Sequence, residues 1–152
     1  MDWDQFNRVN MEIVYFYDKE LKNCPVKEYL SRYYIENGAD AGVRNKNLNL
    51  LVNIDAKINY VLANFGRPLP PISHNLDRSF NFLEIRQWKN KNILIRIFYF
   101  RYDEMIVLLG CLEKPDNYDN KKEKNKIYRE LLLIQSFQNK FISNPELYEE
   151  YK

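Results

Sequence analysis

Three apolar stretches joined by two short polar turns occupy residues 81–113 and set the narrowest limit on the fold. They read NFLEIRQW (81–88), NILIRIFYF (92–100) and MIVLLGCLE (105–113), and all three are rich in β-branched and aromatic residues. The connections QWKNKN and RYDE are short enough for hairpin turns. The sequence therefore predicts three consecutive antiparallel strands.

Helical periodicity appears on both sides of these strands. Apolar residues recur at intervals of three and four up to Phe65, where GRP ends the pattern: Leu51, Ile54, Ile58, Val61 and Leu62. A shorter helix is expected from Pro25 to a stop at Gly38. The segment DNYDNKKEKNKIYRELLLIQSF predicts a final helix, MEIVYFYD (11–18) predicts a first strand, and the acidic tail ELYEEYK after Pro145 is expected to be loose.

The predicted order is strand, helix, helix, three strands, helix, which is typical of an α+β domain with a small sheet. A length of 152 residues fits a single domain over residues 1–152.

Composition excludes several classes of protein. At 45% hydrophobic and 29% charged residues the chain is globular, and two cysteines are too few for a disulfide framework. One histidine and two distant cysteines offer no metal-ligand spacing, and no glycine-rich phosphate loop is present. No cofactor is therefore expected. Without an apolar leader or spanning stretch, the expectation is a soluble cytoplasmic protein with no membrane partner.

The net charge is only +2, but its distribution is uneven. Between Arg86 and Arg129 the chain carries eleven Lys and Arg residues against six Asp and Glu. A local basic surface of this kind suits a polyanionic partner, although a solvated charged face explains it as well.

Arg96 interrupts the most apolar of the predicted strands. Alternation puts it on the face that also carries Leu94, Phe98 and Phe100. An unpaired charge in a core is costly, so Arg96 needs a partner, a route to water or a function. One interpretation is a structural salt bridge to Glu84 on the preceding strand.

Four motifs in order give the chain a resemblance to a known family. Pro25-Val26, LEIR (83–86), RIFY (96–99) and IVLLGCLEK (106–114) resemble the RelE/ParE toxin superfamily, most closely its HigB-like, phage-derived group. The resemblance covers about residues 11–130, which implies a domain core over that range with extended termini on either side. It implies a RelE-like fold, in which two N-terminal helices pack on a small twisted, mainly antiparallel sheet with a C-terminal helix. It also implies the toxin of a type II toxin–antitoxin system, a ribosome-dependent and metal-independent mRNA endonuclease. Its partners would be mRNA on the ribosome and a cognate antitoxin of the helix-turn-helix type.

The resemblance also implies roles for individual residues. Arg86 and Arg96 match the family's two strand arginines and would bind the scissile phosphate, so that the counter-ion of Arg96 would be RNA. Lys114 matches a strand-end lysine that contacts phosphate. Many relatives carry histidine where this chain has Gly110, so the proton-transfer group has to be sought elsewhere. The candidates are His74, the only histidine, and Tyr118.

Further basic residues are expected to form a rim that binds RNA: Lys89, Lys91, Arg101, Lys121 and Lys122. Trp88 either stacks on a base or packs on Ile95 or Tyr99. Two other functions stay open at this point. One is a gyrase-poisoning toxin of the ParE branch, and the other is a non-catalytic protein-binding module with the same fold.

Overall fold

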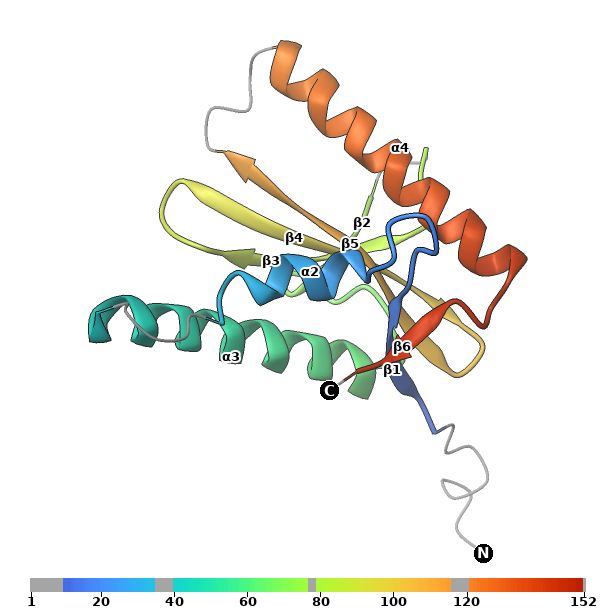
Figure 1. Cartoon of the computed structure of the whole chain (residues 1–152), viewed down its shortest axis with the longest axis horizontal. Coiled ribbons are helices and arrows are strands. Elements are labelled where there is room, and N and C mark those ends of the chain that lie inside the picture. Colours follow the sequence, from blue (N-terminus) through green and yellow to red (C-terminus); the bar gives the residue numbers. More distant parts are fainter. Residues whose placement is uncertain (1–9, 35–39, 77–78, 116–120, 152) are drawn as a thin grey trace, which may run out of the picture.

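The computed structural model describes residues 10–34, 40–76, 79–115 and 121–151. Its elements, in chain order, are β1 (Glu12–Phe16), α2 (Pro25–Ser31), α3 (Ala41–Ala63), β2 (Ser73–Asn75), β3 (Leu83–Trp88), β4 (Ile93–Tyr102), β5 (Met105–Pro115), α4 (Lys121–Ser143) and β6 (Tyr148–Glu150). Figure 1 shows the sheet between α4 on one side and α2 and α3 on the other. The α+β class expected from the sequence is confirmed.

One mixed, open sheet carries the strands in the order β2-β3-β4-β5-β1-β6. Its neighbours pair antiparallel except for β1 and β5, which run parallel. The three predicted strands form β3, β4 and β5, and the two hairpins are as expected. The first strand of the chain therefore lies between β5 and the last strand.

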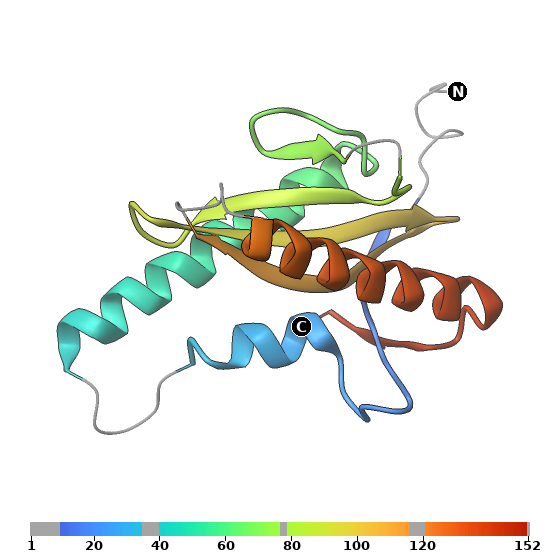
Figure 2. The same ribbon diagram turned by 90° about the horizontal axis from the view of Figure 1, so that it is seen from above.

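The two faces of the sheet bury different side chains. The α2/α3 face carries Ile85, Ile95, Ile97 and Tyr99, which pack against the buried residues of α2 and α3. The α4 face carries aromatic residues, among them Phe98, under the apolar stripe of α4. Seen from above, α4 lies in front of the strands and α3 behind them (Figure 2). This division follows the alternation of β4, because successive strand residues point to opposite faces.

The long helix α3 ends close to the predicted stop, but it begins at Ala41, ten residues before the first periodic residue, Leu51. The side chain of Asp40 accepts a hydrogen bond from the Val43 amide at 2.8 Å, which caps the N-terminus. At the other end, Phe65 and Gly66 adopt positive φ angles of 60° and 78°, and the Gly66 amide donates to the Val61 carbonyl at 2.9 Å. This left-handed turn satisfies a terminal carbonyl and stops the helix.

Several expectations about boundaries were wrong. Helix α2 ends at Ser31 rather than near residue 38, and Gly38 lies outside the described residues. The strands β2 and β6 were not expected, because each has only three residues. The buried side of α4 runs along the helix to Phe137 and Phe141, and the second half of the final helix was expected to face the core.

The acidic tail is ordered against the sheet instead of loose. Strand β6 pairs antiparallel with β1, and Lys27 bonds Glu149 at 2.8 Å. Beyond β6, the Tyr151 ring packs on Tyr15 at a centroid distance of 5.4 Å, and its hydroxyl donates a hydrogen bond to Asp55. The last residues thus close the edge of β1.

Strand β5 is paired along only part of one edge. Its partner β1 runs beside Met105–Leu108 and no further. At that point the register between β4 and β5 shifts, and Leu109 is skipped in a β-bulge. From Leu109 to Pro115, the strand has β4 on one side and no strand on the other within the described residues.

Candidate functional site

A single buried carboxylate holds two arginines on the α4 face of the sheet. Arg86 of β3 and Arg96 of β4 are direct cross-strand partners. Arg86 donates from Nε to one oxygen of Glu84 at 2.6 Å, and Arg96 donates from Nε to the other oxygen. The terminal nitrogens of both guanidinium groups lie outside these two hydrogen bonds. The cluster carries two positive charges and one negative charge, so it keeps an excess of one positive charge.

The two arginines differ in their access to solvent. Arg96 is only 8% exposed, and its guanidinium lies 5.1 Å from the centroid of the Phe98 ring, whereas the side chain of Arg86 is 43% exposed. Glu84, at 1% exposure, is the counter-ion of Arg96 in this structure. This is the cross-strand salt bridge that the sequence offers as one interpretation. Arg86 is the arginine that presents positive charge at the surface.

His74 lies beside this cluster. It is the register partner of Glu84 across the β2–β3 pair, so both side chains leave the same face of the sheet. The His74 Nε2 lies 3.0 Å from the carbonyl oxygen of Pro71. A carbonyl can only accept, so Nε2 carries the proton and Nδ1 of the neutral ring is left as an acceptor.

The next row on this face contains Trp88, Leu94 and Lys114, which are in register across β3, β4 and β5. Trp88 is 55% exposed and lies on the face opposite Ile95 and Tyr99, so the expected packing on those two residues is wrong. We call the residues His74, Glu84, Arg86, Trp88, Arg96 and Lys114 the arginine strip.

Two of the predicted RNA-binding residues lie on the opposite face. Lys89 donates to Glu113 at 3.2 Å and lies 5.5 Å from the Tyr33 ring centroid, on the α2/α3 face. Arg101 is at the far end of β4, in register with the buried Ile106 of the same face, and donates to the Asp103 carbonyl. The structure therefore does not bring Lys89 or Arg101 together with the arginine strip.

The remaining predicted residues are placed more simply. Lys91 is exposed in the β3–β4 hairpin loop, and Lys121 and Lys122 are exposed in the first turn of α4. Tyr118 lies outside the described residues. Lys91 therefore lies at the end of the arginine strip that contains Trp88, next to the β3–β4 turn.

Close packing explains why position 110 is glycine. A Cβ built on Gly110 would lie 3.1 Å from Cδ1 and 3.2 Å from Cγ1 of Ile134 on α4. Both distances are tighter than normal van der Waals contact between carbon atoms. A side chain at this position would therefore require Ile134 of α4 to shift.

Sequence reasoning missed a second polar cluster, on the other side of β5. The hydroxyls of Tyr29 and Tyr33 both donate to Oε1 of Glu113, at 2.7 and 3.1 Å. Lys89 donates to the same oxygen, and Arg32 lies 4.0 Å from it. The only sequence signal was the spacing of Tyr29 and Tyr33 on one helix face, which aromatic packing explains equally well.

The electrostatics of this cluster follow from its contacts. Burial acts to raise the pKa of Glu113, but the hydrogen bonds from Tyr29 and Lys89 outweigh it, and the pKa lies below its ordinary value. Burial and the hydrogen bonds to Tyr33 and Glu113 raise the pKa of Tyr29. Burial also raises the pKa of the nearby Cys111 thiol, so this cysteine is not an activated nucleophile.

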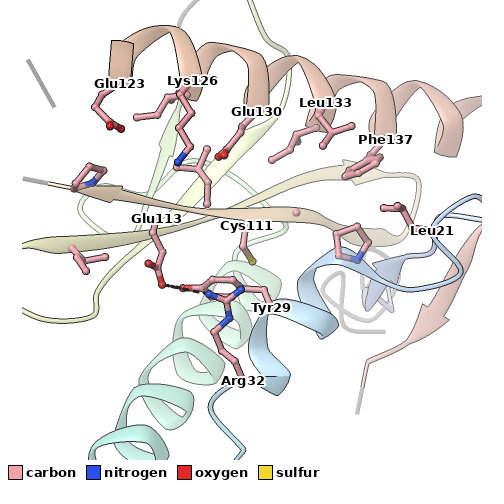
Figure 3. A pocket seen from close by; sticks show the side chains of 17 residues that line it. Leu21, Tyr29, Arg32, Cys111, Glu113, Glu123, Lys126, Glu130, Leu133 and Phe137 are labelled. Carbon is pink, nitrogen blue, oxygen red and sulfur yellow. Dashed lines mark hydrogen bonds and ion pairs between the residues drawn. The ribbon is translucent and has the colours of Figure 1, made fainter. Parts of the chain in front are cut away.

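The cluster lies in a groove of about 650 Å³ along the free edge of β5. Figure 3 shows α4 above the strand and α2 below it, with Glu113 directed toward Tyr29 and Arg32. Among the described side chains, no group of three His, Cys, Asp or Glu residues is arranged to hold a metal ion. Among the residues that the structure describes, no helix is long and apolar enough to cross a bilayer.

Comparisons with protein-family models, with curated proteins and with solved structures each found no match to this chain. The assignment of a function therefore rests on the residues and the geometry of this chain.

Proposed function

We propose that this chain is the toxin of a type II toxin–antitoxin pair and cleaves mRNA on the ribosome without a resident metal ion. The observation that carries the proposal is the arginine strip. Two arginines share one carboxylate on rigid neighbouring strands, and a histidine with a free acceptor nitrogen lies in register beside them. The order of motifs that resembles the RelE/ParE superfamily supports the same proposal, and so does a sheet with α2 and α3 on one face and α4 on the other.

In this proposal the residues of the strip have distinct roles. Arg86 binds the scissile phosphate through its terminal nitrogens, while Glu84 and Arg96 act as positioning residues that fix its guanidinium. Nδ1 of His74 takes the proton of the 2′-hydroxyl. The 2′-oxygen then attacks phosphorus, and the bond to the 5′-oxygen breaks. The leaving 5′-oxygen takes a proton from solvent water and the imidazolium of His74 returns its proton to solvent, so the products are a 2′,3′-cyclic phosphate and a 5′-hydroxyl. Arg96 binds no RNA directly.

The arginine strip is a shallow surface that does not enclose its substrate, and in this proposal the ribosome positions the mRNA against it. It holds mRNA in a fixed position, and proximity of this kind can replace much of the catalytic machinery of a deep active site. Exposed Trp88, two residues after Arg86 on the same face, is placed to stack on a base next to the bound phosphate. We therefore expect strong cleavage on ribosomes and weak cleavage of free RNA.

The test is expression of the chain from an inducible promoter with mapping of mRNA 5′ ends. Wild type is expected to arrest growth and to produce breaks in translated messages. Arg86→Ala should reduce cleavage by about 100-fold because it removes the phosphate contact, and His74→Ala should do the same. The control is Lys46→Ala, which should remain toxic. Lys46 is an exposed residue of α3, on the side of the sheet opposite the arginine strip.

Each alternative has its own result in the same experiment. DNA-damage signalling with intact mRNA would support a gyrase poison, and the absence of any growth defect would support a non-catalytic binding module. Breaks that persist at full level in Arg86→Ala would overturn the role of the strip.

A further inference from the structure

We propose that Ser73 is a positioning residue for the reaction, because its hydroxyl holds the loop that fixes both His74 and Arg86. The inference rests on the proposed function, since it concerns the two groups that act on RNA there. The loop, which we call the α3–β2 loop, comprises residues 64–72, between the end of α3 and the start of β2. It contains neither of the two groups, yet its main chain contacts both.

Two consecutive carbonyls of the α3–β2 loop contact the arginine strip. The carbonyl oxygen of Pro71 lies 3.0 Å from Nε2 of His74. The carbonyl of the next residue, Ile72, accepts a hydrogen bond from the Arg86 amide at 3.2 Å. The first contact sets which ring nitrogen of His74 carries the proton, and the second fixes the main chain from which the Arg86 side chain leaves. A shift of this short segment therefore moves both groups of the site together.

The main chain of Arg86 depends on the loop because β2 is short. Strand β2 pairs with β3 only as far as Ile85, so Arg86 lies beyond the last residue pair. On this edge the Arg86 amide donates to Ile72, and the Arg86 carbonyl accepts a hydrogen bond from Nζ of Lys57 at 2.8 Å. The loop and a lysine of α3 thus take the place of a paired strand at the residue that binds phosphate in the proposed reaction.

Ser73 ties the loop to the start of β2. Its side chain is fully buried and leaves the α2/α3 face of the sheet, as does that of its register partner Ile85. Oγ accepts a hydrogen bond from the Leu69 amide at 2.8 Å and donates one to the Arg67 carbonyl at 3.3 Å. The Leu69 carbonyl in turn accepts from the amides of Ile72 and Ser73, at 3.0 and 3.1 Å. Both main-chain polar groups of Leu69 are therefore bonded to Ser73.

The Ser73 hydroxyl compensates for two prolines in this turn. Pro70 and Pro71 have no amide hydrogen, so neither can donate a hydrogen bond that holds the turn. Without the Ser73 hydroxyl, the Leu69 amide loses its acceptor. A polar group left without a partner beside a core is costly, so the turn is expected to shift until that amide meets water. The two carbonyls that hold the site would shift with it.

The first test compares the histidine tautomer in wild type, Ser73→Ala and Ser73→Thr, which keeps the hydroxyl. His74 is the only histidine of the chain, so the ¹⁵N signals of its neutral ring are assigned without ambiguity. In Ser73→Ala the ratio of the Nε2–H to the Nδ1–H tautomer should fall about fivefold, the equivalent of one hydrogen bond. Ser73→Thr should keep the wild-type ratio. So should the control Ser31→Ala, which removes a hydroxyl that donates to the Glu28 carbonyl within α2.

Hydrogen exchange gives a second measurement. The Arg86 amide should exchange about tenfold faster in Ser73→Ala than in wild type, whereas the amides paired between β4 and β5 should change by less than about twofold. A general loss of stability would accelerate both sets by the same factor, so the difference identifies a shift of the loop. Ribosome-dependent cleavage of mRNA should fall about tenfold in Ser73→Ala and recover to within about twofold of wild type in Ser73→Thr.

The results separate this inference from the proposed function. A wild-type tautomer ratio and wild-type Arg86 exchange in Ser73→Ala would overturn the role of Ser73, whether or not the chain cleaves mRNA. A wild type that cleaves no mRNA on ribosomes would overturn the proposed function, and the tautomer ratio and the exchange rate would still decide whether Ser73 holds the loop.

A second variant covers the case in which Ser73→Ala does not fold. Ser73→Cys fills a similar volume, but a thiol is a much weaker hydrogen-bonding group than a hydroxyl. Its tautomer ratio and its Arg86 exchange should move in the same direction as those expected for Ser73→Ala. Wild-type values of both in Ser73→Cys would equally overturn the inference.

Discussion

Arg96 of β4 forms a buried ion pair with Glu84 of β3, diagonally across two strands of the sheet. Both residues are less than one-tenth exposed, and the Arg96 guanidinium lies over the aromatic ring of Phe98. A pair of this kind contributes little net stability compared with apolar residues of the same shape. Its loss is costly, however. Without Glu84, Arg96 is buried and unpaired, and without Arg96 one buried oxygen of Glu84 loses its partner while the other keeps Arg86. This asymmetry gives the first prediction.

Arg96→Ala is expected to lower the free energy of unfolding by about 3–5 kcal/mol, as measured by urea denaturation. The double variant Arg96→Leu with Glu84→Leu should recover most of that loss, because no charge is then left in the core. Arg86→Ala is the control: its exposed guanidinium leaves Glu84 still paired with Arg96, and the cost should stay within about 1 kcal/mol. An unfolding free energy of Arg96→Ala equal to that of wild type would contradict this prediction, because it would mean that the Glu84 carboxylate is hydrated in the variant.

Gly110→His tests whether the chain lost its proton-transfer group or never had room for one. The imidazole would displace Ile134, and overpacking of this kind costs about 1–3 kcal/mol. We expect a lower melting temperature and no gain in RNA cleavage. Gly110→Ala adds only the Cβ and should lose less stability. A stable Gly110→His with faster cleavage would show that α4 can move away from the sheet.

The Glu113 cluster should make stability depend on pH. Its folded pKa lies below the ordinary value of 4.5, so the folded protein binds fewer protons than the unfolded chain as pH falls through this range. The stabilising contribution is therefore complete above the ordinary pKa and is lost as pH falls through the folded pKa. The difference in unfolding free energy between wild type and Glu113→Gln should shrink between pH 7 and pH 3. Glu104→Gln should show no comparable change in its difference from wild type.

Removal of the tail tests its contribution to the fold. A chain ending at Leu147 loses the β1–β6 pairing, the Lys27–Glu149 ion pair and the packing of Tyr151 on Tyr15. We expect a loss of about 2 kcal/mol and faster hydrogen exchange in β1. Tyr151→Phe keeps the ring and removes only the hydrogen bond to Asp55, so it should cost less. Unchanged exchange in β1 would indicate that the tail is dispensable.

Most of the fold could be predicted from periodicity, because long elements repeat their pattern several times. The alternation of residues 93–100 assigned the two faces of β4 correctly, and the spacing of Ile54, Ile58 and Val61 located α3. Strands β2 and β6 could not be found this way, since three residues do not establish a period. Strand β6 also consists of Tyr148, Glu149 and Glu150, whose composition resembles a solvated tail, and only its pairing with β1 makes it a strand.

The candidate site was harder to predict than the fold. Lys89 and Arg86 are three residues apart, yet they reach opposite faces of the sheet because strand side chains alternate and the turn begins at Lys89. Glu84 was recognised as a possible partner of Arg96, but nothing in the sequence showed that one carboxylate would serve both arginines. That arrangement depends on cross-strand register, which only the three-dimensional structure fixes.

The pairing of β1 with β6 also bears on how the chain folds during synthesis. Of the strands of this sheet, β1 is made first, but its partner β5 follows about ninety residues later and its other partner, β6, follows only after α4. Contacts so distant along the chain form slowly, because a long loop has to close before they contribute. Strand β1 therefore has no partner strand until β5 is made, and its second edge stays open until β6 follows. A chain halted between β5 and β6 would hold a sheet in which one edge of β1 is unpaired.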